Sequence, residues 1–204
     1  MKQTEPWLWR IACAILLGLQ LYAGSSPTLV ITPQYKLMLA VCFCILLTLA
    51  VRPGRGKTNR TLWLLLLFAY YLWMLADLLF FDAAFGRTAG RGGVNLEPLH
   101  TIRNYLRAYR RGNIPLGPVV LNLAGNLAAF APMAVFLPAL FRAQRNILLF
   151  FVTVFLMVAT VEIVQHITNT GSCDIDDLIL NTAGALALWI LLLPYRLCKS
   201  KGTG

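Results

Sequence analysis

The chain has 204 residues, of which 58% are hydrophobic and 13% charged, and its mean hydropathy is +0.68. This composition excludes an ordinary soluble globular domain and predicts an integral membrane protein. The net charge of +10 does not indicate a nucleic-acid partner, because the Lys and Arg residues lie almost entirely in short connections between apolar runs.

Six apolar runs have about the 20 residues that a helix needs to cross a bilayer. They cover residues 7–23, 35–51, 62–81, 118–141, 147–167 and 175–197. The sequence therefore predicts an all-α fold, a polytopic membrane bundle of about six transmembrane helices. We expect three parts: two N-terminal transmembrane helices in residues 1–60, a four-helix core with an outer loop at 82–117 in residues 61–197, and a short basic cytoplasmic tail at 198–204.

The first run allows two interpretations. Lys2 and a short apolar centre before small residues are typical of a signal peptide, with residues 1–24 cleaved. Trp7 and Arg10 at one end and Tyr22 at the other are typical of a retained membrane helix, which we favour. With the N-terminus inside, eleven Lys and Arg residues lie on the cytoplasmic side and seven outside. Since positive residues are retained in the cytoplasm, the count favours this orientation.

The outer loop at 82–117 contains a predicted amphipathic helix that starts near Leu99. Its apolar residues recur at helical spacing on one face, while Arg103, Arg107, Arg110 and Arg111 take the other. Such helices rest in the headgroup layer, where Arg can pair with phosphate or carboxylate through two hydrogen bonds. The alternative is a helix that only covers the bundle and meets anionic lipid.

Polar residues inside the apolar runs form a second pattern. When the loops between the runs are numbered along the chain, each of these residues lies near the end of its run that adjoins an odd-numbered loop. The residues are Asp77, Asn122, Asn126, Glu162, Gln165, His166, Asp177 and Asn181. Successive runs cross the membrane in opposite directions, so we expect all of these residues on the outer side. Charged or amide groups at membrane depth are costly unless paired or hydrated, and their gathering there predicts a functional site.

The fifth run places Glu162, Gln165 and His166 at i, i+3 and i+4, so the three side chains share one helix face and can act on a single neighbour. In the fourth run, Asn122 and Asn126 share a face, as residues that bind a neighbouring helix often do. Two prolines further along the fourth run predict kinks, at Pro132 and Pro138.

In the sixth run, Asp174, Asp177 and Asn181 share one helix face, and Asp176 is turned about 100° away. Asp174 also fits the position of an N-cap, and we assign it to capping. Asn181 lies two turns deeper than the cap, so capping does not explain it.

The chemistry that these residues support is limited. His100 and His166 are the two histidines, so neither a metal site nor a cofactor is predicted. The five cysteines form no disulfide framework or thiolate site. Glu162 and Asp177 are the candidates for acid and base catalysis, although no nucleophile identifies a reaction. Whether the protein is an enzyme stays open at this point, and binding is favoured.

Three blocks in this order, "VNLEPLHTI", "LNLAGNLAAFAPMAVFLP" and "VEIVQHITNTGSCDIDDLILNTAGA", resemble the VanZ family of bacterial membrane proteins over roughly residues 60 to 195. The residues at the family's motif positions are Asn95, Pro98, Asn122, Asn126, Phe130, Pro132, Glu162, Gln165, Asp174, Asp176, Asp177, Asn181 and Gly184. The resemblance implies the bacterial cytoplasmic membrane and a role in resistance to glycopeptide antibiotics, especially teicoplanin. Many members carry an Arg just before the acidic motif, where this chain has Gly171 and Ser172.

We therefore expect an outer-leaflet site, walled by the third to sixth runs and covered by the basic helix, that binds a lipid-linked cell-wall precursor or a lipoglycopeptide. The expected ligand contacts are Asp77, Asn95, Arg103, Arg107, Asn122, Asn126, Glu162, Gln165, His166, Asp174, Asp176, Asp177 and Asn181. Membrane lipids are the expected partners, and the oligomeric state stays open. The alternatives are an enzyme that remodels an envelope lipid through Glu162 and Asp177, and a purely structural membrane protein.

Overall fold

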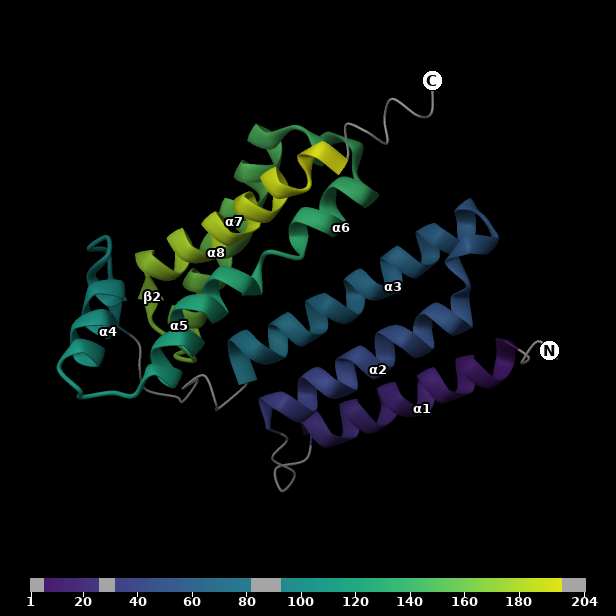
Figure 1. Ribbon diagram of the computed structural model, residues 1–204, viewed down its shortest axis with the longest axis horizontal. Helices are drawn as coiled ribbons and strands as arrows, with labels where there is room; N and C mark the ends of the chain where they lie inside the picture. The colour runs from purple at the N-terminus through teal and green to yellow at the C-terminus, as the bar shows by residue number, and fades with distance from the viewer. Residues whose placement is uncertain (1–5, 26–31, 82–92, 196–204) are drawn as a thin grey trace. The chain divides into compact units, whose positions relative to one another are not determined.

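The computed structural model describes residues 6–25, 32–81 and 93–195. The chain divides into two compact units, Met1–Trp73 and Met74–Gly204 (Figure 1). Within the described residues, six helical segments are long and apolar enough to cross a membrane. These candidate spans are Trp7–Gly24, Tyr35–Arg55, Lys57–Phe81, Leu116–Leu140, Ile147–Ile167 and Ile175–Tyr195. The predicted all-α class and its six spans are confirmed.

The first unit consists of α1 (Pro6–Ser25), α2 (Pro33–Val51), a short 3₁₀ turn at Pro53–Arg55 and most of α3 (Lys57–Ala76). Proline suits the first turn of α2 because its fixed φ is already helical and its missing N–H would have no helical partner there. The three helices lie side by side in Figure 1. The rings of Phe43 on α2 and Tyr70 on α3 stack with centroids 4.1 Å apart.

The second unit begins with the last turn of α3. Its elements, in chain order, are a π-helical turn at Asp77–Phe81, β1 (Val94–Asn95), α4 (His100–Arg110), α5 (Leu116–Ala129), α6 (Met133–Leu140), a 3₁₀ turn at Arg142–Arg145, α7 (Ile147–Ile167), β2 (Cys173–Asp174) and α8 (Ile175–Leu191). In Figure 1, α4, β2 and the first turns of α5 and α8 lie at one end of this unit, which we call its polar end.

The fourth span is interrupted where the sequence predicts its first kink. Helix α5 ends at Ala129 and α6 begins at Met133, with Pro132 immediately before it. Proline lacks the N–H that would continue the helix, and its ring clashes with the preceding turn. Tight i to i+3 hydrogen bonds, such as Met133 N to Phe130 O at 3.1 Å, carry the chain through the break. Pro138 lies inside α6 and does not end it, so the second expected kink produces no break.

One face of α7 forms the centre of the second unit. Phe150, Val154 and Val158 follow one another at i, i+4 and i+8, and all three are completely buried. The same stripe continues to Glu162 and Gln165, which are 5% and 1% exposed. The interior of this unit therefore changes from apolar to polar along a single helix face, towards the polar end.

Helices α5 and α8 approach each other more closely than side chains normally allow. A Cβ added to Gly184 on α8 would lie 1.7 Å from the carbonyl oxygen of Leu127 on α5, so only glycine fits. This contact lies next to Asn126 on α5 and one turn beyond Asn181 on α8. The missing side chain thus brings the polar residues of the two helices together.

A short parallel bridge, which the sequence did not predict, connects β1 and β2. Val94 pairs with Cys173 and Asn95 with Asp174, and Cys173 N donates to Gly93 O at 2.9 Å. The bridge joins the segment before α4 to the segment before α8. It therefore places the side chains of Asn95 and Asp174 beside each other at the polar end.

Candidate functional site

Asp174 begins α8 and connects it to α7. Its Oδ1 accepts a hydrogen bond from Asp176 N at 2.9 Å, which confirms the predicted N-cap. The backbone N–H of Asp174 donates to Glu162 Oε2 at 3.1 Å. Both carboxylates are buried, and Glu162 thereby holds the start of α8 against the end of α7.

The carboxylate of Asp174 also holds the segment that leads into α4. Asn95 Nδ2 donates to its Oδ1 at 3.0 Å, and Thr101 Oγ1 donates to its Oδ2 at 2.5 Å. The Asn95 amide lies 3.1 Å from Thr101 Oγ1 as well, so the three side chains form one network. Thr101 was not among the residues expected from the sequence.

Asp176 caps α4 from a different helix. Its Oδ1 accepts from Leu99 N at 2.5 Å and its Oδ2 from Ile102 N at 3.0 Å. These amides belong to the N-cap residue and the third helical residue of α4, the two that a capping box satisfies from within one helix. The side chain of Leu99 makes no capping hydrogen bond, and its φ is +65°. Asp176, which is fully buried, supplies the hydrogen-bond acceptors that the first residues of α4 do not provide themselves.

Five residues thus fasten α4 and β1 to α7 and α8. We call Asn95, Thr101, Glu162, Asp174 and Asp176 the anchoring cluster. Asp176 does turn away from the Asp177 face, as expected, and its two carboxylate oxygens are occupied by backbone N–H groups. The hydrogen bonds of this cluster fix the position of the amphipathic helix.

A second polar group lies between α5 and α8. Asn126 Nδ2 donates to Asp177 Oδ1, and Asn181 Nδ2 donates to the backbone oxygen of Asp177 at 2.8 Å. Asn122 lies one turn before Asn126 on the same helix face. Among the described residues, the buried Oδ1 atoms of Asn122 and Asn181 have no hydrogen-bond partner. We call Asn122, Asn126, Asp177 and Asn181 the amide group; two of its acceptors are buried and lack a partner.

The polar residues of α7 reach different neighbours, so the expectation that they act on a single one was wrong. Glu162 accepts from β2, whereas Gln165 Nε2 donates to Leu79 O at 2.7 Å. The Leu79 carbonyl belongs to the π-helical turn that begins with half-buried Asp77. The three side chains diverge because a helix places i and i+3 about 60° apart, enough to face separate elements.

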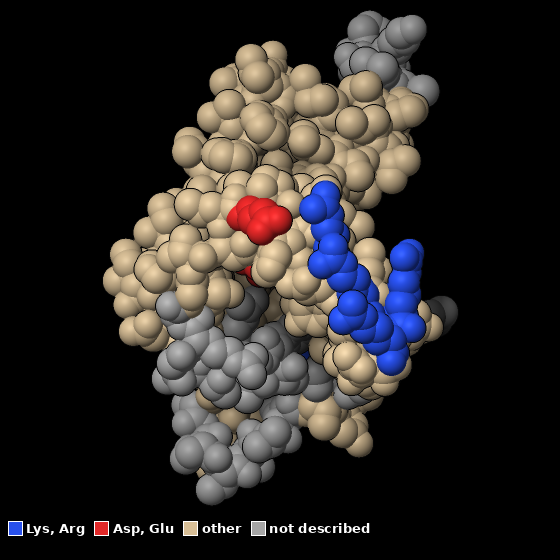
Figure 2. Space-filling view, turned by 90° about the vertical axis from the view of Figure 1, so that its left-hand side faces the viewer, with Lys and Arg blue, Asp and Glu red and all other residues tan. Residues whose placement is uncertain are grey.

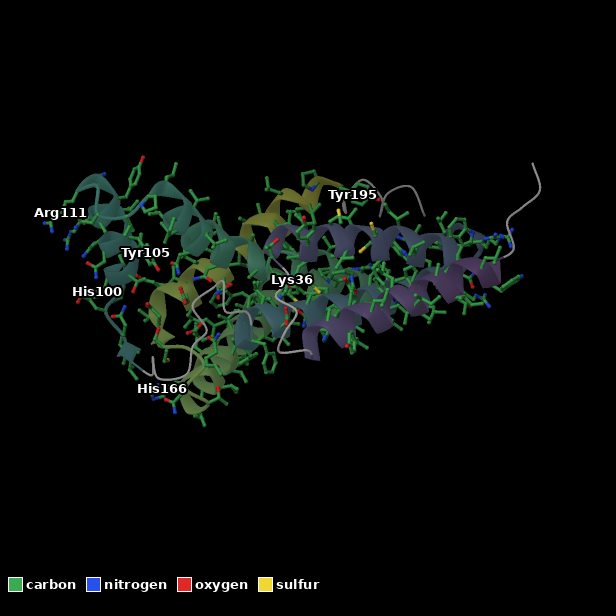
Figure 3. The ribbon with its side chains drawn as sticks, turned by 90° about the horizontal axis from the view of Figure 1, so that it is seen from below. Lys36, His100, Tyr105, Arg111, His166 and Tyr195 are labelled. Carbon is green, nitrogen blue, oxygen red and sulfur yellow. The ribbon has the colours of Figure 1, made fainter. Side chains whose placement is uncertain are left out.

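His166 lies in the last turn of α7, at the position labelled in Figure 3, and is half-buried. Within the described part of the chain, its buried Nδ1 has no hydrogen-bond partner. His166 therefore joins neither the anchoring cluster nor the amide group through a hydrogen bond of that atom.

The basic face of α4 is open. Arg103, Arg107, Arg110 and Arg111 are exposed, and Figure 2 shows basic side chains gathered in a stripe over this helix. Along the part of the chain that the structure describes, none of these arginines forms an ion pair with a carboxylate. Figure 3 shows His100, Tyr105 and Arg111 along the same helix. The amphipathic helix is confirmed.

Half-buried Cys173 of β2 lies near two carboxylates. Burial, followed by the nearby carboxylates of Glu162 and Asp174, raises the pKa of the Cys173 thiol above its ordinary value of 9.0. The described residues contain no group of three or more His, Cys, Asp and Glu side chains that could hold a metal ion. Among the charged side chains described at this end, the arginines at 103, 107, 110 and 111 are exposed, whereas the unpartnered oxygens of the amide group are buried.

Comparison with known proteins identifies the relatives of this chain. The family model described as VanZ/LLP1 matches residues 62–197, which include both polar groups and all of α4. No curated protein and no solved structure matches the chain. Because the match covers well over half of the sequence, the chain belongs to the VanZ/LLP1 family and is a membrane protein with several spans.

Proposed function

We propose that this protein binds the anionic head of an amphiphile at the polar end of its second unit. The candidate ligands are a lipid-linked cell-wall precursor and a lipoglycopeptide of the teicoplanin kind. Both combine a hydrocarbon tail with a phosphate or carboxylate group. In this proposal the polar end faces outward from the bacterial cytoplasmic membrane, and binding modulates sensitivity to lipidated glycopeptides.

The observation that carries the proposal is the anchoring of a basic helix. Three exposed arginines lie on α4 and a fourth, Arg111, is its C-cap, and the anchoring cluster holds the start of that helix by hydrogen bonds to Asp174 and Asp176. A guanidinium group can donate two parallel hydrogen bonds to a phosphate or carboxylate. Because the helix is already fixed, less conformational entropy is lost when a ligand binds.

The amide group supports a second contact to the same ligand. The buried Oδ1 atoms of Asn122 and Asn181 have no partner among the described residues, and in this proposal a hydroxyl or amide donor of the ligand reaches them when the side chains that cover them move. A buried acceptor without a partner is costly, so a donor from a ligand would stabilise this group. Asn126 and Asp177 would keep the neighbouring side chains in place through their mutual hydrogen bond.

No chemical step is part of the proposal. Glu162 accepts a hydrogen bond from Asp174 N and Asp177 accepts one from Asn126. Each of these hydrogen bonds engages one of the two oxygens of its carboxylate. Envelope-lipid remodelling through Glu162 and Asp177 therefore stays the alternative, and binding is proposed because the exposed arginines of α4 provide groups for an anion.

Antibiotic susceptibility tests the proposal in cells. Teicoplanin and vancomycin share a cell-wall target, but only teicoplanin carries a lipid tail. We expect the protein to raise the inhibitory concentration of teicoplanin several-fold and to leave that of vancomycin unchanged. The double variant Arg103→Gln/Arg107→Gln should lose this protection at equal membrane level. Equal protection against both drugs, or none, would contradict the role in resistance.

A binding measurement tests the site itself. The full chain in phosphatidylcholine nanodiscs is titrated with teicoplanin, and we expect the double variant to bind at least about tenfold more weakly. The matched control, Lys57→Gln/Arg142→Gln, removes the same charge from two exposed positions outside α4 and should bind like the native chain. Unchanged binding by the Arg103 and Arg107 variant would remove α4 from the site.

A further inference from the structure

The first unit contains a cavity of about 740 Å³ between its three helices. Side chains from all three line it, among them Leu17 of α1, Leu47 of α2 and Leu66 of α3. Its size falls within the range of about 300–1,000 Å³ that is usual for ligand sites. The lining is almost entirely apolar, which suits hydrocarbon and not a polar solute.

The two ends of this cavity differ. At one end, Tyr70 OH on α3 donates to Gln20 Oε1 on α1 at 3.2 Å, and the Tyr70 ring stacks on Phe43 of α2. These two contacts connect the three helices. At the other end the lining includes Arg10 and Asn59. Asn59 is held in place, because its Nδ2 donates to Val51 O at 3.0 Å. The cavity is therefore apolar along its length and basic at one end.

The Lys and Arg residues of this region outnumber its acidic residues, and Glu5 is the acid that precedes Arg10 in the sequence. Between Glu5 and Asp77 the chain has six Lys and Arg residues and no Asp or Glu. Five of the six lie at the Arg10 end of the helices: Arg10, Arg52, Arg55, Lys57 and Arg60. Arg10 is exposed and is the fourth residue of the first candidate span, near the end that meets the lipid head groups. The abundant anions at that level are lipid phosphates.

We propose that an anionic phospholipid occupies this cavity, with an acyl chain between the three helices and its phosphate at Arg10. The cavity is partly open and its lining is apolar, so in a membrane a lipid chain fills it more favourably than water does. Arg10 selects the head group by charge, and Asn59 lies beside it as a hydrogen-bonding neighbour. The site is separate from the polar end and does not rest on the proposed function.

Lipid retention tests this site. The full chain is reconstituted with equal amounts of phosphatidylglycerol and phosphatidylcholine, washed extensively in mild detergent, and examined by native mass spectrometry. We expect about one retained phospholipid per chain, with phosphatidylglycerol preferred. The Arg10→Gln variant should lower that preference about fivefold, the effect of one Lys or Arg charge near a lipid surface. Arg60→Gln, at the same end but outside the cavity lining, should keep it.

A second pair of variants tests the cavity apart from the charge. Ala14 lines the cavity, whereas Leu19 lies on the opposite face of α1 and is 59% exposed. We expect Ala14→Trp to abolish retention of both lipids and Leu19→Trp to preserve it. Equal retention by all four variants would show lipid bound only around the protein and would overturn the proposal. So would a native chain that retains no lipid or does not prefer phosphatidylglycerol.

Discussion

At the scale of single residues, Asp174 and Asp176 at the start of α8 mainly accept hydrogen bonds that hold the start of α4 in place. Helix N-termini leave backbone N–H groups without helical partners, and a residue of the same segment usually satisfies them. In α4 this task falls to Asp176, which lies more than 70 residues later in the sequence. The same carboxylate that the sequence suggests as a ligand contact is thus needed to hold the basic helix.

We predict that Asp176→Ala releases the start of α4. The Leu99 and Ile102 amides lose a charged acceptor, and hydrogen bonds of this type contribute about 1.5–3 kcal/mol each. Amide hydrogen exchange over residues 99–102 should become at least about tenfold faster, while the middle of α7 keeps its protection. The control Glu97→Ala, at an exposed position just before α4, should exchange like the native chain. Unchanged exchange in Asp176→Ala would mean that other contacts hold α4.

Cys173 gives a pH-dependent prediction. Its pKa is raised by burial and then by Glu162 and Asp174, so less thiolate is present at any given pH than at a free cysteine. In a chain that retains Cys173 alone among its cysteines, the rate of maleimide labelling should rise with the thiolate fraction as the pH rises and reach half of its maximum above pH 9.0. Glu162→Gln removes one negative neighbour, lowers this pKa and should speed labelling at pH values below it. A labelling curve with its midpoint below 9.0 would contradict the closed environment of β2.

The sequence allowed part of this chemistry to be predicted. Asp174 was assigned to capping because it precedes the sixth run and is followed by acidic residues in the first helical turn, which the helix dipole favours. The partners of Asp176 and the role of Thr101 were not predictable, since they depend on how the segment before α4 folds back onto α8. One signal was present: Leu99 cannot cap a helix with its own side chain, so α4 needed an acceptor from elsewhere.

At the scale of the elements, Gly184 sets the distance between α5 and α8. We predict that Gly184→Ala destabilises the protein, because the new methyl group would overlap the Leu127 carbonyl. Overpacking of this kind costs about 1–3 kcal/mol, and here the obstacle is backbone, which cannot rotate away. Thermal unfolding in detergent should show a lower Tm.

The matched control for this substitution is Gly18→Ala inside α1. A Cβ at the exposed Gly18 meets nothing within 4 Å, and alanine favours helices more than glycine does. Its Tm should therefore stay the same or rise slightly. If Gly184→Ala unfolds at the native temperature, the two helices can separate without loss of stability, and the close contact is not needed.

The sequence predicted helices better than their connections. The span at 147–167 agrees with α7 at both ends, because hydropathy needs only a continuous apolar run and Asn146 caps its start. The bridge between β1 and β2 has two residues in each strand, too few to show an alternating pattern. Its pairing of Asn95 with Asp174 joins segments 79 residues apart, which no local pattern reveals.

At the scale of the whole molecule, the acidic residues are concentrated in the later part of the chain. Seven of the eight Asp and Glu residues lie from Asp77 onward, while the first 76 residues hold Lys and Arg with a single acid, Glu5. The family model likewise begins at residue 62. The polar groups that carry the proposed function therefore belong to the family region, and the proposed lipid cavity also uses the helices before it.

Orientation decides which ligands can reach the polar end, and we predict that the N-terminus is cytoplasmic. On this topology eleven of the 18 Lys and Arg residues are inside and seven outside. Positive residues in short loops are retained in the cytoplasm, so the larger number marks the inner side. The six arginines of residues 82–117 run against this bias, which makes a direct measurement necessary.

Cysteine labelling on intact cells provides that measurement. In a chain whose five native cysteines are replaced, Asn113→Cys adds a thiol between α4 and α5, and Ala143→Cys adds one after α6. Both positions are exposed, and neither change alters the charge count. A membrane-impermeant maleimide should label the first variant from outside and the second only after the cells are permeabilised. The reverse pattern would place α4 in the cytoplasm, where an extracellular glycopeptide could not reach its arginines. The hydrogen bonds that hold α4 to α8 do not depend on this orientation.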